Sequence, residues 1–222
     1  MKIAIVTGGH IEYGFVREEF DKRKFDVIIA CDSGCRFFLD NGIDFDYAVG
    51  DFDSLEKAQY DRLMNQFKDK VTKYPSEKDY TDTEIGVKLA MDLIGERANA
   101  YYDSEIVIYG ATGNRIDHVL GNIELLYEPT MRGVRIALID EHNRVELIKN
   151  ERVIERKEGY PFFSIVPYNS EEVMVTETGA KYELKEHVLK KGVTLGVSNE
   201  IKGERACVTV TGGELILVLA RD

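Results

Sequence analysis

Residues 47–67, YAVGDFDSLEKAQYDRLMNQF, join a short apolar run to an acidic turn and a helix-like segment. The pattern predicts a buried strand at Tyr47–Val49 and a helix over Leu55–Phe67. Asp51 and Asp53 then stand at the end of the strand, and they project the same way if the backbone stays extended. Two carboxylates there suit a hydrated Mg²⁺ ion that also binds substrate phosphates. An acidic turn that forms for backbone reasons alone is the alternative, and this stretch by itself leaves both open.

The same alternation of apolar run and helical pattern extends along the first 130 residues. It predicts a parallel sheet with helices on both faces, which is an α/β sandwich. The other expected strands are Ile3–Val6, Val27–Ala30, Val71–Tyr74 and Ile106–Tyr109, and the other expected helices lie around 37–39, over 82–94 and over Ile116–Tyr127.

The pattern changes after Glu128-Pro129. Short β-rich runs separated by turn residues follow, and they predict an antiparallel β-sandwich. We therefore expect two domains, 1–130 and 131–222. The expected strands of the second domain are Val134–Ile139, Arg144–Ile148, Phe162–Val166, Val173–Thr176, Cys207–Val210 and Leu215–Leu219.

Composition narrows the class of protein. The chain has 222 residues, a formal net charge of -11 and no basic stripe, which argues against nucleic-acid binding. Three scattered cysteines do not form a disulfide framework and are expected to be reduced thiols. No apolar run approaches the length of a signal peptide or a membrane span, so a cytoplasmic protein that does not bind membranes is expected.

Several polar loops follow the strands of the predicted parallel sheet. Asp32 comes just after the second strand, Asp51 and Asp53 after the third, and the glycine-containing loop Gly110–Asp117 after the strand that ends at Tyr109. Ligands of parallel α/β sheets bind beyond the carboxyl ends of the strands. These loops therefore predict a metal–phosphate site at one edge of the sheet.

The segment Lys78–Glu84, KDYTDTE, precedes an apolar helical pattern. Thr81 and Glu84 have the spacing of a capping box, in which Thr81 is the N-cap and Glu84 bonds back to its amide. Asp82 then occupies the first helical position, where the helix dipole favours an anion. In the functional interpretation Asp82 is a third metal ligand, and Lys78 and the helix amides contact a phosphate. The segment alone supports both interpretations equally.

The loop Gly110–Asp117, GATGNRID, combines glycines with a cation. Glycines permit a phosphate to approach the backbone, and Arg115 can bind one bidentately. The loop lacks the Gly-Lys-Ser/Thr ending of a P-loop, and an ordinary surface arginine is the alternative. Asp117 either pairs with His118 as an acid–base couple or makes a cap or salt bridge. His118 has no second histidine at ligand spacing, so it is not expected to bind metal.

Taken together, these motifs resemble the thiamine pyrophosphokinase (thiamine diphosphokinase) family. The resemblance implies an α/β domain followed by a β-sandwich, and a homodimer with active sites between subunits. It also implies transfer of the terminal diphosphate of ATP to the hydroxyl of thiamine, with Mg²⁺ as cofactor. The residues that carry it, in the family's order, are Asp32-Ser-Gly34, GDFDS, KDYTDTE, GATGNRIDH with Gly121-Asn122, and GVTLGVSNEI at 192–201.

The resemblance also implies residue roles. The chain has no tryptophan to stack on thiamine, and Tyr182 is the candidate replacement. The first domain would bind ATP and Mg²⁺, and the second would bind thiamine and form the dimer. By motif position, Asp51, Asp53 and Asp82 resemble the magnesium ligands; Lys78, Thr81 and Arg115 the diphosphate contacts; Asp32 and Asp117 further groups lining the site; and Ser198 and Asn199 the segment that meets the thiamine pyrimidine.

Two other functions remain open at this point. A metal-dependent phosphohydrolase also places Asp-x-Asp after a strand, although normally after the first strand and not the third. A non-catalytic nucleotide or thiamine sensor would keep the pocket without turnover. The number of carboxylates beside anionic phosphates favours the enzyme.

Overall fold

The computed structural model describes residues 1–96 and 101–222, which form two compact units, Met1–Glu141 and His142–Asp222. The first is an α/β unit with a parallel sheet, and the second is built from antiparallel strands. The predicted fold class is therefore confirmed.

The α/β unit contains a parallel sheet with the strand order β6-β5-β1-β2-β3-β4. Its central strands are almost continuously apolar, as expected for strands that are covered on both faces. Because all six strands run the same way, their carboxyl ends lie at one edge. The strands are β1 (Lys2–Val6), β2 (Val27–Cys31), β3 (Tyr47–Gly50), β4 (Val71–Lys73), β5 (Glu105–Tyr109) and β6 (Arg135–Ile139).

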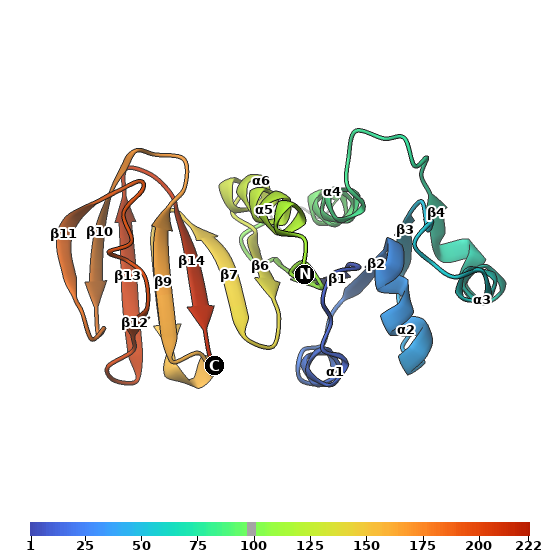
Figure 1. Cartoon of the computed structure of the whole chain (residues 1–222), viewed down its shortest axis with the longest axis horizontal. Helices are drawn as coiled ribbons and strands as arrows, with labels where there is room; N and C mark the ends of the chain where they lie inside the picture. The colour runs from blue at the N-terminus through green and yellow to red at the C-terminus, as the bar shows by residue number, and fades with distance from the viewer. Residues whose placement is uncertain (97–100) are drawn as a thin grey trace. The chain divides into compact units, whose positions relative to one another are not determined.

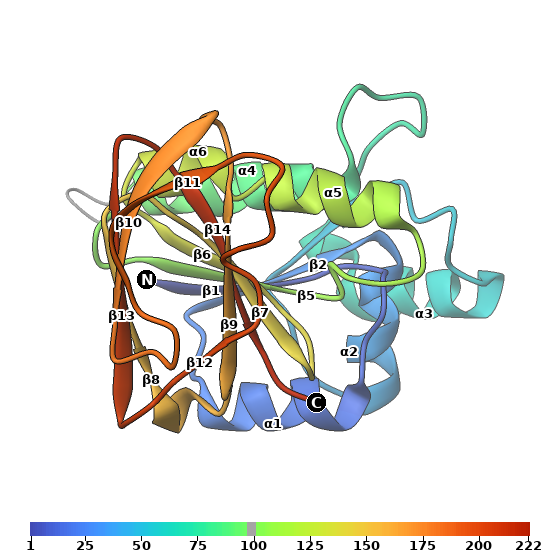
Figure 2. The same ribbon diagram turned by 60° about the vertical axis from the view of Figure 1, so that its left-hand side comes forward.

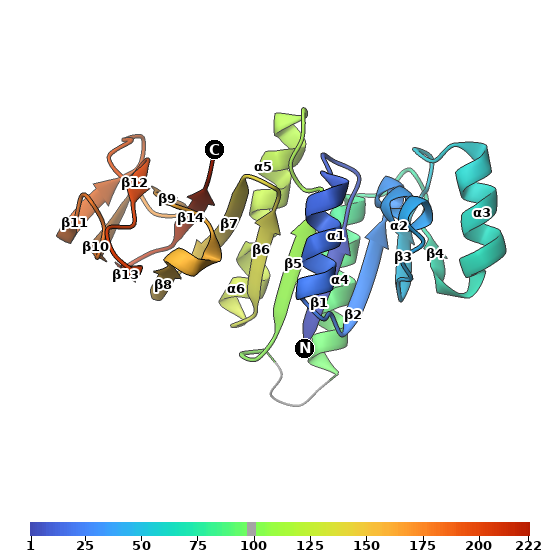
Figure 3. The ribbon, with the colours of Figure 1, turned by 90° about the horizontal axis from the view of Figure 1, so that it is seen from below.

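Helices cover both faces of this sheet. Helices α1 (Tyr13–Lys22) and α2 (Cys35–Asn41) lie on one face, and α4 (Asp82–Gly95), α5 (Ile116–Glu124) and α6 (Tyr127–Met131) lie on the other (Figures 1 and 2). Figure 3 shows α1 crossing in front of the strands, and α3 (Lys57–Phe67) beyond β4.

Helix α1 was not among the predicted elements. Val16 is its one fully buried residue, and Phe15 and Phe20 are partly buried against the core. Tyr13, Val16 and Phe20 do have helical spacing, but the run is short and otherwise polar. The helix begins where the Glu12 carboxylate accepts hydrogen bonds from the amides of Gly14 and Phe15. A side-chain cap thus starts a helix whose hydrophobic pattern is short.

The segment 116–139 differs from the prediction. The expected single helix is two helices, α5 and α6, and Pro129 lies inside the first turn of α6, where a missing amide proton costs nothing. Strand β6, which was expected to open the β-sandwich, pairs in parallel with β5 and completes the sheet of the α/β unit. A buried parallel strand and a sandwich strand have the same short apolar pattern, so the sequence did not distinguish the two.

The second unit packs two antiparallel sheets face to face, with the strand orders β12-β9-β14-β7 and β11-β10-β13-β8 (Figure 1). Inward side chains of both sheets form its core. The strands are β7 (Asn143–Ile148), β8 (Glu151–Glu155), β9 (Phe162–Pro167), β10 (Glu172–Thr178), β11 (Leu184–Lys190), β12 (Asn199–Glu200), β13 (Arg205–Thr211) and β14 (Leu215–Ala220).

Three of these strands, β8, β11 and β12, were not predicted. Strand β11 lies at the edge of its sheet, and most of its side chains are exposed. Strand β8 is also an edge strand with a mixed polar pattern, and β12 has only two residues. Edge strands need no buried face, so they lack the period-two signal used to find strands.

One core position of the second unit holds a carboxylate. Strand β10 alternates regularly, and Val173, Val175 and Glu177 share its buried face. The Glu177 side chain is 2% exposed, and its Oε1 has no hydrogen-bond partner in the described part of the chain. Burial raises the pKa of Glu177 to about 7, although a hydrogen bond from Asn199 opposes the shift.

This raised pKa predicts a pH-dependent stability. The pKa of Glu177 in the folded protein lies above its ordinary value. Its contribution to the free energy of unfolding is therefore fully present below pH 4.5 and is lost as the pH rises through about 7. The expected loss is on the order of 2–3 kcal/mol. Urea unfolding of the wild type and of Glu177→Gln at pH 5 and pH 8 checks this. The stability of the variant should fall less between the two pH values than that of the wild type.

Candidate active site

A cavity of about 670 Å³ opens in the α/β unit at the carboxyl edge of its sheet. Five loops supply its walls, each following a strand of the parallel sheet, as the predicted clustering requires. Its lining residues include Thr7–His10, Asp32, Ser33, Asp51, Ser54, Ser76, Lys78, Tyr80–Thr83, Gly110–Arg115, His118, Val119 and Asn122.

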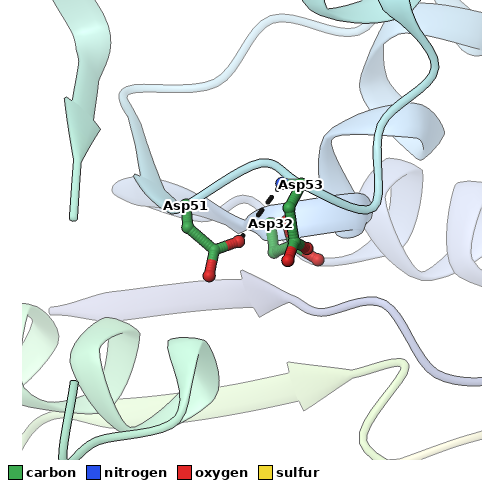
Figure 4. A group of neighbouring side chains, drawn as sticks. All are labelled: Asp32, Asp51 and Asp53. Carbon is green, nitrogen blue, oxygen red and sulfur yellow. Dashed lines mark hydrogen bonds between the residues drawn. The ribbon is translucent and has the colours of Figure 1, made fainter. Parts of the chain in front are cut away.

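Three aspartates converge beside this cavity. Asp32, Asp51 and Asp53 each offer a carboxylate oxygen within 4.8 Å of the others (Figure 4). The backbone between Asp51 and Asp53 is not extended, because Phe52 has a φ of 59°. The two side chains therefore meet through a left-handed kink, and not through the strand alternation that was expected. The amide of Asp53 donates to Asp51 Oδ1 at 3.2 Å.

Gly50 allows the loop after β2 and the loop after β3 to approach each other. Its φ is 146°, and a Cβ there would lie 3.1 Å from the Cα and N atoms of Asp32. Asp32 itself has a φ of 46°, which is uncommon for a non-glycine residue. The close approach brings the Asp32 carboxylate to the Asp51–Asp53 pair.

Lys78 joins Asp51 to Asp82. Its Nζ lies 3.1 Å from Asp51 Oδ2 and 3.1 Å from Asp82 Oδ1, and its side chain is 11% exposed. Its contact with Asp51 is a directional hydrogen bond, whereas its contact with Asp82 is an ion pair without that geometry. Asp82 therefore lies beside Lys78. The cluster of neighbouring carboxylates consists of Asp32, Asp51 and Asp53, and it does not include Asp82.

Burial and charge set the pKa values of this group. Burial opposes ionisation of Asp51, but the hydrogen bonds from the Asp53 amide and from Lys78 outweigh it and lower the pKa of Asp51. Burial raises the pKa of Asp82 despite Lys78, and the charges of Asp32 and Asp51 add to the shift. The pKa of Lys78 is raised because its two carboxylate partners outweigh its burial. The site thus concentrates negative charge around one ammonium group.

Helix α4 begins at the cavity as predicted. Thr81 is its N-cap and accepts a hydrogen bond from the amide of Glu84 at 3.2 Å, and Asp82 is its first residue. The reciprocal bond of the expected capping box is absent from the described contacts, because the Glu84 carboxylate pairs with Lys88 at 3.0 Å. The next residue, Thr83, is fixed by a 2.9 Å hydrogen bond to Thr7 at the end of β1.

The loop after β5 lies against the loop after β1. The amide of Gly9 donates to the carbonyl of Gly110 at 2.8 Å, and the amide of His10 donates to Thr112 at 2.7 Å. Asn122 on α5 fixes the same loop through a 2.7 Å bond to the carbonyl of Ala111. The loop is therefore held from both sides where it faces the cavity.

Arg115 and Asp117 form an ion pair at the end of this loop, where α5 begins. Arg115 Nη2 lies 2.5 Å from Asp117 Oδ2, and both side chains are exposed. Hydrogen bonding by Arg115 lowers the pKa of Asp117 to about 2. Arg115 lines the cavity, whereas Asp117 is not among the lining residues.

Sequence reasoning missed the loop Thr7–His10. It lines the cavity, and His10 Nε2 lies 2.7 Å from Glu141 Oε1. The signal was present, because Gly8-Gly9 follows the apolar run of β1 as the other site loops follow their strands.

Ser198 and Asn199 lie in the second unit. Ser198 is exposed with a φ of 63°, and its amide donates to Ser164 Oγ. The side chain of Asn199 is 5% exposed and bonded to neighbours within its own unit. Their role toward thiamine stays a prediction.

The donor set of the acidic cluster fits a hard divalent cation. It consists of carboxylate oxygens, the ligands that Mg²⁺ prefers. The Oδ1 atom of Asp32 is buried and has no hydrogen-bond partner within the described residues, so it is available to a cation. The metal assignment of Asp51, Asp53 and Asp82 itself remains a prediction.

The fold and site define an α/β protein with an acidic, glycine-rich cavity beyond its parallel strands, followed by a β-sandwich. The family model "Thiamin pyrophosphokinase, catalytic domain" matches residues 21–138, and "Thiamin pyrophosphokinase, vitamin B1 binding domain" matches 151–216. The chain belongs to the thiamine pyrophosphokinase family, as its motifs predicted.

Individual relatives agree with the family models. The chain is 33% identical over 195 residues to a thiamine pyrophosphokinase of Bacillus subtilis, covering 87% of each. The crystal structure of the thiamine pyrophosphokinase from Bacillus subtilis superposes with a TM-score of 0.86 at 31% identity, covering 100% of both chains. The thiamin pyrophosphokinase from Geobacillus thermodenitrificans gives 0.84 at 30% identity, covering 100% of this chain and 98% of the other. Across residues 1–96 and 101–222, the structure contains no helix with the length and apolar character to span a membrane.

Proposed function

We propose that this protein is a thiamine diphosphokinase that works as a cytoplasmic homodimer. The hydroxyl oxygen of thiamine attacks the β-phosphorus of ATP, the bond from that phosphorus to the oxygen of the α-phosphate breaks, and AMP leaves with the electron pair. The observation that carries the proposal is the acidic cluster at a cavity within the segment that matches the family's catalytic domain. A site carboxylate or solvent takes the hydroxyl proton.

Asp51, Asp53 and Asp82 would hold Mg²⁺, and Asp32 is close enough to Asp51 and Asp53 to add a further ligand. When bound, the ion neutralises phosphate charge and aligns the reacting groups. Lys78 already bridges Asp51 and Asp82, so its ammonium group lies beside the proposed position of the ion and its phosphates.

Lys78, Thr81 and Arg115 supply the proposed diphosphate contacts. All three line the cavity from the loops after β4 and β5. Arg115 is fully ionised and now binds Asp117 through two nitrogens. A phosphate can replace the Asp117 carboxylate, because both present two oxygens to the planar guanidinium group. Charge that develops toward AMP is thereby stabilised.

The second unit would supply thiamine recognition, because residues 151–216 match the family's vitamin B1 binding domain. Ser198 and Asn199 are the proposed contacts, and Tyr182, which is 63% exposed, offers an aromatic face. Thiamine is cationic, so the negative potential of an acidic site favours its approach. In the proposed homodimer this segment serves the partner subunit.

AMP formation from ATP tests the proposal. We expect AMP and thiamine diphosphate only when thiamine and Mg²⁺ are both present, measured by liquid chromatography of the nucleotides. Release of inorganic phosphate from ATP without thiamine would identify a phosphohydrolase instead. Binding of ATP or thiamine without AMP formation would identify a sensor.

A further inference from the structure

The buried carboxylate of Glu177 bonds to the segment that carries the proposed thiamine contacts. Asn199 Nδ2 donates a hydrogen bond to Glu177 Oε2 at 3.0 Å. The same Nδ2 donates to the carbonyl of Tyr182 at 2.8 Å, and Asn199 Oδ1 accepts from the amide of Tyr182 at 3.1 Å. Glu177 thus holds Asn199, and Asn199 holds both backbone groups of Tyr182.

Two chain segments meet at this point. The turn that carries Tyr182 runs beside β12, where Ala180 bridges Ile201 and the amide of Lys181 donates to the carbonyl of Glu200. The Tyr182 ring itself projects to solvent with 63% exposure, and Lys181 Nζ lies 5.5 Å from its centroid. A buried polar group therefore fixes the base of an exposed aromatic side chain.

The position of Glu177 is unfavourable for packing alone. Its neighbours on the inward face of β10 are valines, and a buried carboxyl group with an unpartnered oxygen is less stable there than an apolar residue. Sequences break a local rule in this way mainly where function requires it. The whole arrangement lies within residues 151–216, the match to the vitamin B1 binding domain.

We propose, on the basis of the function proposed above, that Glu177 is a positioning residue for thiamine recognition. It orients the Asn199 amide, and Asn199 in turn sets the position of Tyr182 and of the backbone at 198–200. Glu177 is assigned no contact with the substrate, since its side chain is buried and its Oε2 accepts a hydrogen bond from Asn199.

The test replaces Glu177 with methionine, which has a similar length and forms no hydrogen bond to Asn199. We expect the KM for thiamine to rise about tenfold, with the KM for ATP and kcat within twofold of wild type. Stability at pH 8 should be equal or higher, because the buried carboxylate is gone. Glu177→Gln keeps an acceptor for Asn199 and should leave the thiamine KM within threefold. Glu172→Gln, an exposed position on the same strand, is the matched control.

If Glu177 has a structural role only, stability, kcat and both KM values should all worsen in Glu177→Met. Either that pattern or an unchanged KM for thiamine overturns the proposal. Calorimetric titration of the full chain with thiamine needs no turnover, so it separates this proposal from failure of the proposed reaction. If Glu177→Met does not fold, Asn199→Asp is the second variant, and it should weaken thiamine binding. Adding Glu177→Gln to it should recover at least threefold in thiamine affinity, because the side chain at 177 then donates and the side chain at 199 accepts. Absence of that rescue also overturns the proposal.

Discussion

Asp53→Ala is expected to lower kcat about a thousandfold while leaving the fold unchanged. The Asp53 carboxylate is exposed, and within the described contacts its side chain accepts a hydrogen bond from Ser54 Oγ. The backbone bond from the Asp53 amide to Asp51 survives the substitution. What the variant loses is one oxygen ligand of the proposed cation beside the phosphates, and lost stabilisation of transition-state charge typically costs a factor of about 10²–10³ or more in kcat.

Steady-state AMP formation at limiting and saturating Mg²⁺ measures this effect, and the thermal unfolding midpoint reports the fold. Asp61→Ala, at an exposed position on α3, should retain wild-type rates. Rates like those of the wild type in Asp53→Ala at limiting Mg²⁺ would reject Asp53 as a ligand. Recovery of the rate at high Mg²⁺ would instead show weakened binding of the cation.

Lys78→Met is expected to destabilise the metal-free protein by about 3 kcal/mol, since removing one partner of a buried ion pair leaves the other charge uncompensated. Asp51 and Asp82 lose their shared ammonium group, and the side chains of both are largely buried. Mg²⁺ should recover a large part of this loss, because the ion supplies positive charge to the same carboxylates. Urea unfolding in EDTA and in saturating Mg²⁺ provides the comparison.

Lys22→Met serves as the control for this measurement. Lys22 pairs with Glu18 at 3.0 Å on the surface of α1, where both side chains are exposed, and such pairs contribute about 0–1 kcal/mol. An equal destabilisation of Lys78→Met in EDTA and in Mg²⁺ would contradict the idea that lysine and metal serve the same carboxylates.

The sequence was sufficient to bring the loops of the candidate site to one edge of the sheet. Once the alternation of strands and helices indicates a parallel sheet, the loops carrying Asp32, Asp51 and Gly110–Asp117 must share one edge, whatever the details of packing. Helix α4 and its N-cap Thr81 were predicted correctly because the local pattern determines both.

Contacts between loops were beyond sequence reasoning. The grouping of Asp32 with Asp51 depends on the positive φ of Asp32 and Phe52 and on the absence of a side chain at Gly50. The predicted strand Val173–Thr176 stopped at a carboxylate, because alternation alone gives no reason to place Glu177 in a core. Features of this kind arise from tertiary contacts that no local pattern encodes.

Two cationic side chains that line the cavity already have acidic partners: Lys78 pairs with Asp51 and Asp82, and Arg115 pairs with Asp117. An incoming anion therefore competes with a carboxylate for each of these cations. A small anion such as sulfate gains little from one such exchange, whereas a polyphosphate chain can make several at once. The ion pairs of the free protein thus favour binding of long, multiply charged ligands over binding of small inorganic anions.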